Sequence, residues 1–296
     1  MRTVRIFAAL MPFIVSGAFC SAAEWIVDFN EAKVIAEKEG KDILAEFTGS
    51  DWCPWCIKLK KEVMDQEAFK NEASKQYVLL ELDYPQKKPQ AENIKKLNKM
   101  LAERFALEPL PTVIMIDSKG RAYARTGQYQ PGGIEKWLGI LASTRNLKAE
   151  RDALFAAADK AAGEEKAVLL DRALDGLNKH GCLIGYEETI QDIMKLDGEN
   201  KKGLLSKYSS YSLLEFVKKK LAAEEYDAAL KEIEQYIAHY SPGGNVKQQV
   251  YFMKAVALNG KSDNKGALEA LEIAHAADPK SDDAATIAKT IADLKK

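Results

Sequence analysis

Cysteine is scarce in this chain, which has only four among 296 residues. Cys20 lies in the N-terminal segment, so only Cys53, Cys56 and Cys182 belong to the remaining sequence. Three cysteines are too few for a disulfide-stapled scaffold, and the hydrophobic content of 47% is enough for packed cores. Charge of one sign is also lacking, since 43 basic residues face 44 acidic ones. This balance argues against a nucleic-acid partner.

Long hydrophobic runs are missing as well, because no segment approaches twenty continuous apolar residues. We therefore expect no stable membrane span after processing. The N-terminus carries Arg2 and Arg5, a short apolar run over 6–15 and a small-residue end, which is typical of a secretory signal peptide over 1–23. Lipid anchoring at Cys20 is a minor alternative. We expect export to a bacterial periplasm, with secretion as the alternative.

The 273 residues after the signal segment predict two domains, 24–145 and 146–296. The first alternates helical and strand patterns and predicts an α/β domain. Its expected helices are 30–38, 54–75, 91–105 and 133–143, and its expected strands are 43–48, 77–83, 112–117 and 121–126. A turn at Ser118–Gly120 joins the last two strands. We see no Gly-rich phosphate loop, Ser/His/Asp set or paired-carboxylate motif.

The second domain loses the strand signal and predicts an all-α region rich in Ala, Leu, Lys and Glu. Similar helices begin at Tyr226 and Lys265, and the prolines that follow them, Pro242 and Pro279, lie 37 residues apart. This spacing resembles tetratricopeptide-like helical hairpins, whose period is about 34 residues.

The segment Trp52-Cys53-Pro54-Trp55-Cys56 carries the chemistry. It follows an apolar strand pattern and opens an amphipathic helix, so the two thiols lie at i and i+3 on the first helical turn. Such thiols can close a small disulfide ring. Unpaired backbone N–H groups and the helix dipole favour a thiolate on the first cysteine. We expect Cys53 to be the nucleophile.

This motif and Leu110-Pro111-Thr112 ahead of a strand resemble the thioredoxin superfamily, in particular its exported members. The resemblance covers the first domain and implies a thioredoxin-like fold. It also implies a cis peptide bond before Pro111, facing the cysteines. Because proline has no N–H, the backbone of Leu110 is then the expected docking edge for a substrate segment.

The resemblance further implies that Glu46 accepts a proton from Cys56. Two departures stand out: the loop before Cys53 is one residue longer than in the prototype, and Leu79 matches the lysine that partners the acid there. A solvated edge position for Glu46 is the alternative, because charged residues are rarely buried without partners.

Trp52 and Trp55 flank the thiols and offer an apolar contact surface, although core packing is an equal alternative for Trp52. Pro54 removes no helical hydrogen bond, because it lies on the first turn, and it should stiffen the ring that a Cys53–Cys56 disulfide closes. Zinc binding is the competing chemistry, but a closed site needs four ligands, and His180, His239 and His275 are isolated. Cys182 is expected to be a packing residue.

These features predict an exported thiol:disulfide oxidoreductase that uses the Cys53/Cys56 couple and no other cofactor. The favoured direction is the reduction of protein disulfides. Its partners would be protein or peptide thiols and disulfides, and a redox partner protein. The alternative is a helical-repeat interaction or chaperone-type protein in which the thioredoxin-like domain only binds.

Overall fold

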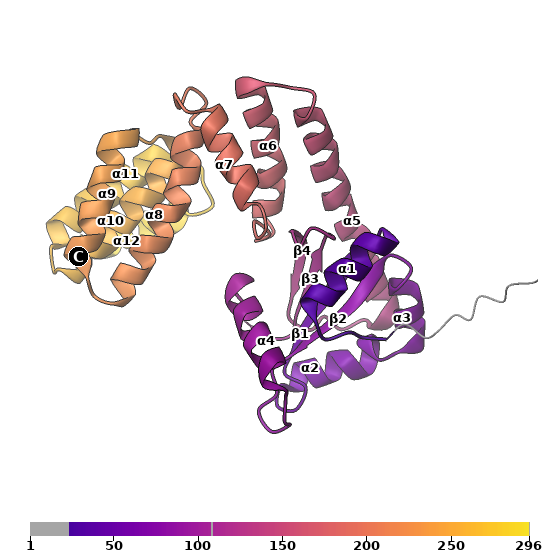
Figure 1. Cartoon of the computed structure of the whole chain (residues 1–296). Coiled ribbons are helices and arrows are strands. Elements are labelled where there is room, and N and C mark those ends of the chain that lie inside the picture. Colours follow the sequence, from indigo (N-terminus) through magenta and orange to yellow (C-terminus); the bar gives the residue numbers. More distant parts are fainter. Residues whose placement is uncertain (1–23, 108, 296) are drawn as a thin grey trace, which may run out of the picture. The chain divides into compact units, whose positions relative to one another are not determined.

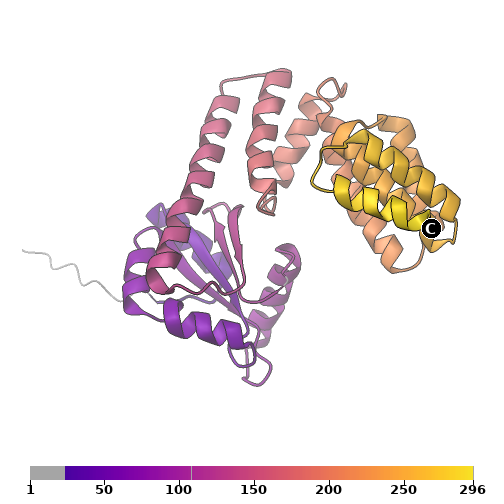
Figure 2. The ribbon, with the colours of Figure 1, turned by 180° about the vertical axis from the view of Figure 1, so that it is seen from behind.

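The structure is a computed structural model that describes residues 24–107 and 109–295, and Figures 1 and 2 show it from opposite sides. The chain forms two compact units. The first holds the chain up to Val113 together with Gly127–Gly139, and the second holds Ile114–Thr126 and Ile140–Lys296. The expected signal peptide over 1–23 lies outside the described residues. The domain boundary at residue 145 stays a prediction.

A four-stranded sheet with the order β2-β1-β3-β4 forms the α/β part. Its strands are β1 (Asp42–Thr48), β2 (Tyr77–Asp83), β3 (Thr112–Ile116) and β4 (Ala122–Gly127). β1 and β2 are parallel, with Glu46 opposite Glu81. Every residue of β1 is buried, because an interior strand is covered on both faces. The turn between β3 and β4 is as expected, and Gly120 there adopts a left-handed φ of 80°.

Local sequence explains where the first helix, α1 (Phe29–Glu39), begins and ends. The carboxylate of Asp28 accepts hydrogen bonds from the N–H groups of Asn30 and Glu31, which caps the N-terminus. Gly40 ends the helix with φ of 65°, a conformation that other residues adopt at a cost. The buried Phe29 lies 6.1 Å from Phe105, measured between ring centroids, and so ties α1 to the core.

The prediction of one continuous helix over 54–75 is wrong. The chain instead forms α2 (Pro54–Leu59), a π-helical turn η1 (Lys60–Met64) and α3 (Glu67–Ala73). Helix α4 (Glu92–Arg104) agrees with expectation, whereas α5 (Gly133–Ala158) runs fifteen residues beyond its expected end at 143. No glycine or proline interrupts the sequence from 140 to 158, so nothing in the local sequence stops the helix.

A buried ion network explains why α5 continues. The Arg151 guanidinium, only 1% exposed, donates to the Asp117 carboxylate at 2.9 Å and to the Tyr186 hydroxyl at 2.6 Å. Arg121 also pairs with Asp117, at 2.8 Å, and Asp152 pairs with Arg151 at 2.7 Å. Within the second unit, these bonds join α5, the β3–β4 turn and the segment that ends at Tyr186.

The remaining described helices form the all-α region that the sequence predicts. They are α6 (Gly163–Asn178), α7 (Glu187–Leu196), α8 (Leu204–Ala222), α9 (Tyr226–Tyr240), α10 (Gly244–Gly260), α11 (Asn264–Ala277) and α12 (Ala284–Leu294). Neighbouring helices from α8 to α12 pack side by side in both views (Figures 1 and 2). α9 and α11 lie where the repeat pattern places helices, and the tetratricopeptide-like assignment stays a prediction.

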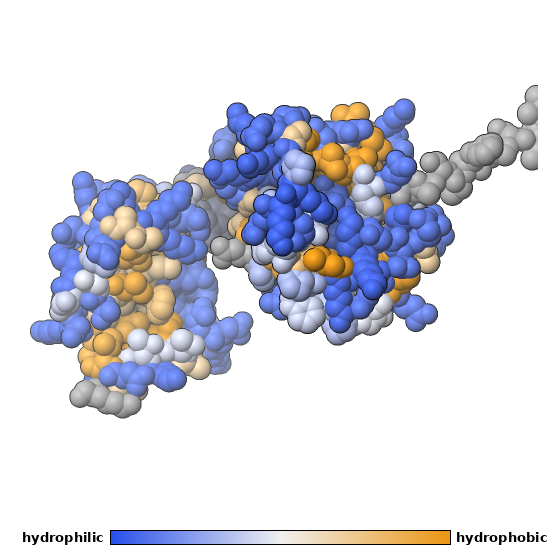
Figure 3. Space-filling model, turned by 90° about the horizontal axis from the view of Figure 1, so that it is seen from below, coloured by the Kyte–Doolittle hydropathy of each residue, from blue (hydrophilic) through white to orange (hydrophobic). Residues whose placement is uncertain are grey.

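Hydrophilic side chains dominate the face seen from below, and apolar side chains gather there in separate patches (Figure 3). Across the part of the chain that the structure describes, we find no helix with the length and apolar character needed to cross a membrane. The large apolar side chains that are exposed include Trp52 and Trp55, at 40% and 57%. Both belong to the cysteine loop.

Candidate active site

Cys53 and Cys56 form a disulfide at the start of α2, with their Cα atoms 5.2 Å apart. Cys53 is the N-cap residue, and its Sγ accepts a hydrogen bond from the Cys56 N–H at 3.3 Å. This donor and the other free N–H groups of the first turn favour negative charge on the Cys53 sulfur. Cys53 keeps 6% of its surface exposed and Cys56 none, so Cys53 is the sulfur that an incoming disulfide can reach.

The Leu110-Pro111 loop faces the cysteines. The peptide bond between these residues is cis, as the resemblance implies. The Leu110 carbonyl oxygen lies 3.8 Å from Cys53 Sγ, which puts this backbone beside the reactive sulfur. The loop is held from both sides, because the Thr112 hydroxyl donates to the Pro109 carbonyl at 2.7 Å and the Gln128 N–H donates to the Pro111 carbonyl at 3.0 Å.

Two cavities open on either side of this loop. The first has a volume of about 460 Å³, and we name it the cysteine cavity. It is lined by Trp52, Cys53, Tyr84, Ala102, Leu107, Pro109 and Leu110. The second, about 440 Å³, is lined by Trp55, Lys58, Pro111 and Tyr129 among others. Leu110 and Pro109 line both. The loop backbone therefore lies between two open grooves, an arrangement suited to an extended segment.

The two tryptophans are held by different contacts. Trp52 is not packed in the core, and its indole N–H donates to the Tyr84 carbonyl at 2.8 Å. Trp55 stacks on Tyr129 with 5.8 Å between ring centroids, and the Lys58 ammonium lies 5.1 Å from the Tyr129 ring. The Tyr129 hydroxyl donates to Glu62, which fixes the ring. Pro54, between the cysteines, is exposed.

Glu46 is fully buried on the interior strand β1, so the alternative of a solvated edge position is wrong. Neither carboxylate oxygen has a hydrogen-bond partner among the described residues. Burial raises the pKa of Glu46 to about 8, and the charge of Glu81 raises it in the same direction. The Lys60 ammonium opposes this shift. At neutral pH, Glu46 is therefore mostly a protonated acid that can exchange a proton.

The cation near Glu46 comes from a residue that sequence reasoning overlooked. Lys60 belongs to a lysine-rich stretch that reads as a solvated helix face, yet it lies partly buried on η1 and pairs with Glu81 on β2. Leu79 lies opposite Leu44 and not opposite Glu46. Tyr129 was also missed, because no local motif marks a tyrosine that reaches the cysteine loop from a distant segment.

Cys182 is a buried residue of the second unit, as expected, and its Sγ lies 3.2 Å from the His180 carbonyl oxygen. Burial raises the pKa of its thiol to about 12, which disfavours the reactive thiolate. In residues 24–107 and 109–295, no group of three or more His, Cys, Asp or Glu side chains is arranged to hold a metal ion.

A dithiol pair at a helix start that faces a cis-proline loop defines a thiol–disulfide oxidoreductase site, and the strand that precedes the pair carries a buried acid. The sequence profile of the thioredoxin-like domain matches residues 29–141, which include Glu46, both cysteines and Pro111. The chain belongs to the thioredoxin-like family.

Two curated relatives come from Chlamydia pneumoniae. The chain is 32% identical over 120 residues to the disulfide bond reductase DsbH, a match that covers 40% of this chain and 72% of DsbH. It is 31% identical over 105 residues to the thioredoxin-related protein DsbJ, covering 36% of this chain and only 30% of DsbJ.

The solved structures that the chain matches include a DsbH oxidoreductase and a thioredoxin from Thermus thermophilus. The DsbH structure is 28% identical, with a TM-score of 0.40, and the match covers 48% of this chain and 94% of that one. The thioredoxin is 16% identical, with a TM-score of 0.31, and the match covers 42% of this chain and 87% of that one.

Proposed function

We propose that the protein is an exported reductase of protein disulfides. The observation that carries the proposal is the Cys53 sulfur, the more accessible of the pair, lying 3.8 Å from the Leu110 carbonyl oxygen between two open cavities. The reducing direction is supported by the relative named as a disulfide bond reductase. Export to a periplasm is supported by the signal-like sequence over 1–23.

The reaction passes two electrons from the dithiol to the substrate. The Cys53 thiolate attacks one sulfur of the substrate disulfide, so that a Cys53–substrate bond forms while the second substrate cysteine leaves as a thiolate and takes a proton from water. The Cys56 thiolate then attacks Cys53 Sγ, which closes the Cys53–Cys56 disulfide and releases the first substrate cysteine. An external dithiol donor, a redox partner protein, must reduce the pair again.

In the molecules in which it is ionised, Glu46 would take the proton from Cys56 before the second attack. Both groups are fully buried, where water is a poor base and a carboxylate with a pKa near neutrality is an effective one. The Glu46→Gln variant should therefore slow the release of substrate while leaving the first attack by Cys53 in place.

The substrate segment would lie along the Leu110-Pro111 backbone. Its side chains would contact Trp52 in the cysteine cavity and Trp55 in the opposite one, and exposed Pro54 would complete the contact surface. The helical region, from about residue 146, would hold a client or redox partner near the site.

Trapping of the mixed disulfide tests the proposal. The Cys56→Ser variant should accumulate a covalent adduct with a disulfide-bonded protein such as insulin, visible as a shifted band on a non-reducing gel. Cys53→Ser should form no adduct, and Cys182→Ser serves as the matched control with full turnover of insulin. An equal amount of adduct from Cys53→Ser and Cys56→Ser would contradict the assignment of Cys53 as the nucleophile.

A further inference from the structure

A third cavity adjoins the cysteine cavity and shares no lining residue with the cavity at Trp55. It measures about 600 Å³ and is lined by the loop from Tyr84 to Gln90 and by one face of α4. Tyr84 and Ala102 line both cavities, so the two join into one groove that starts at Cys53. We name the new part the lysine cavity, because Lys88, Lys95 and Lys99 line it.

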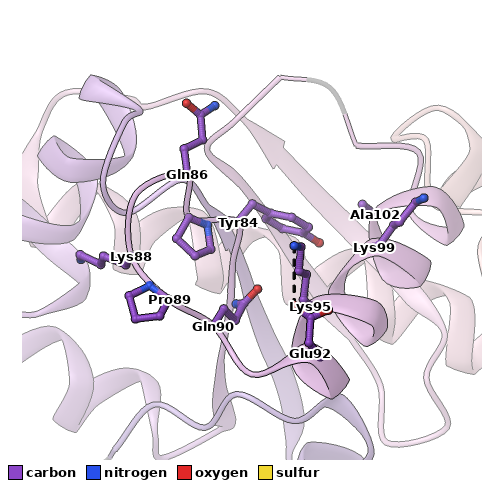
Figure 4. A pocket seen from close by; sticks show the side chains of 10 residues that line it. Tyr84, Gln86, Lys88, Pro89, Gln90, Glu92, Lys95, Lys99 and Ala102 are labelled. Carbon is purple, nitrogen blue, oxygen red and sulfur yellow. Dashed lines mark ion pairs between the residues drawn. The ribbon is translucent and has the colours of Figure 1, made fainter.

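Charge in the lysine cavity is predominantly positive. Among the residues that line the cavity, three lysines face a single acid, Glu92, and Lys95 lies 3.9 Å from it with both side chains largely exposed to water. Such an exposed pair binds weakly and leaves the ammonium groups available. The Asp51 carboxylate, outside the lining, also interacts electrostatically with Lys88. Figure 4 shows Lys95 extending along the Tyr84 ring, with Lys88 and Lys99 on opposite sides of it. Lys88 also donates to the Ser50 hydroxyl, at 3.3 Å.

The side of the groove that Tyr84 forms is held in place before any ligand arrives. The Tyr84 hydroxyl donates to the Asn98 carbonyl at 2.9 Å, and its own carbonyl accepts the Trp52 indole N–H. The carboxylate of Asp51 accepts three N–H groups of the 86–88 loop, at 2.7 to 2.9 Å. Asp51 therefore fixes the 86–88 loop through its hydrogen bonds. Because this side of the groove is already ordered, binding a ligand there costs less entropy.

We infer that the lysine cavity binds acidic side chains of a protein or peptide segment whose disulfide lies at Cys53. This inference rests on the proposed function, since the same extended segment would occupy both parts of the groove. Complementary charge would select segments with Asp or Glu on the Tyr84 side of the disulfide and speed their encounter with the enzyme. The enzyme would thus prefer acidic substrates although its overall charge is close to neutral.

A peptide series tests this preference with the reduced protein, residues 24–296. Three disulfide peptides carry Glu, Gln or Lys at the positions flanking the disulfide and are otherwise identical. We expect kcat/KM to be highest for the Glu peptide, and the Glu-to-Gln ratio to fall about tenfold in the variant Lys88→Gln/Lys95→Gln/Lys99→Gln, which corresponds to about 1.4 kcal/mol shared among three exposed pairs. The ratio should also fall as salt rises.

The matched control is Lys38→Gln/Lys75→Gln/Lys119→Gln, which removes three exposed lysines that line none of the three cavities and should keep the ratio. Equal kcat/KM for the Glu and Gln peptides, or an equal loss of preference in both triple variants, would overturn the inference. Failure to reduce any of the three peptides would instead overturn the proposed function, and the inference with it.

Discussion

Replacing Glu46 by Gln should stabilise the first unit at neutral and alkaline pH. The carboxyl group is fully buried, and its pKa rises from 4.5 to about 8, chiefly because burial penalises the charged form. A glutamine side chain has nearly the same shape and no charge to lose. The variant therefore removes the dependence of folding on this one proton while leaving the packing around β1 in place.

The sign and size follow from the two pKa values of Glu46. Between pH 4.5 and about 8 the folded protein holds a proton that the unfolded chain has released. The free energy of unfolding is therefore highest below pH 4.5 and falls as pH rises toward 8. At about 1.4 kcal/mol per pH unit, the loss reaches about 3 kcal/mol at pH 7 and about 5 kcal/mol above pH 8. The Glu46→Gln variant should lack this loss.

Urea unfolding from pH 5 to 9, followed by tryptophan fluorescence, measures the effect. All four tryptophans lie between residues 25 and 137 and inside the first unit, so the signal reports on that unit. The variant's advantage over the native protein should grow by about 2.5 kcal/mol from pH 5 to pH 7. The exposed Glu37→Gln is the control and should follow the native curve. Parallel pH profiles for native protein and Glu46→Gln would refute the reasoning.

Three further outcomes are expected. Lys60→Gln removes the cation that lowers the pKa of Glu46, so the loss of unfolding free energy should continue above about pH 8. An unchanged pH profile would count against the interaction of Lys60 with Glu46. Arg151→Met leaves the buried Asp117 with fewer partners and should lower the free energy of unfolding by about 3 to 5 kcal/mol, measured by circular dichroism in urea. Adding Asp117→Asn should restore part of this stability, whereas a loss below about 1 kcal/mol would speak against the network. In the reduced protein without residues 1–23, an aromatic disulfide reagent should consume two thiols in the folded state, because Cys53 attacks the reagent and the buried Cys56 then closes the disulfide. A third thiol, Cys182, should react only after unfolding; rapid reaction of all three would contradict its burial.

The sequence predicts most of the α/β elements because their signals are local. The apolar runs over 43–48 and 77–83 mark strands, and the CxxC spacing with the Leu110-Pro111-Thr112 motif marks the site. The position of β1 inside the sheet is a tertiary property. For that reason the burial of Glu46 stayed open until the strand order was known.

The overlooked features all depend on contacts between distant segments. Lys60 reads as one of several surface lysines, and only the π-helical turn and the pairing of β1 with β2 bring it to Glu81. Tyr129 meets Trp55 across 74 positions of sequence. The length of α5 depends on Arg151, whose partners Asp117 and Tyr186 lie more than thirty residues away on either side.

The reduction potential of the Cys53/Cys56 pair tests the central claim most directly. The protein would be equilibrated in graded dithiol buffers and its free thiols trapped and counted. A reductase predicts a reversible two-electron couple near the thioredoxin value of about −270 mV. A couple near about −120 mV would indicate a disulfide-donating oxidase, and the absence of a reversible couple would contradict a redox function altogether.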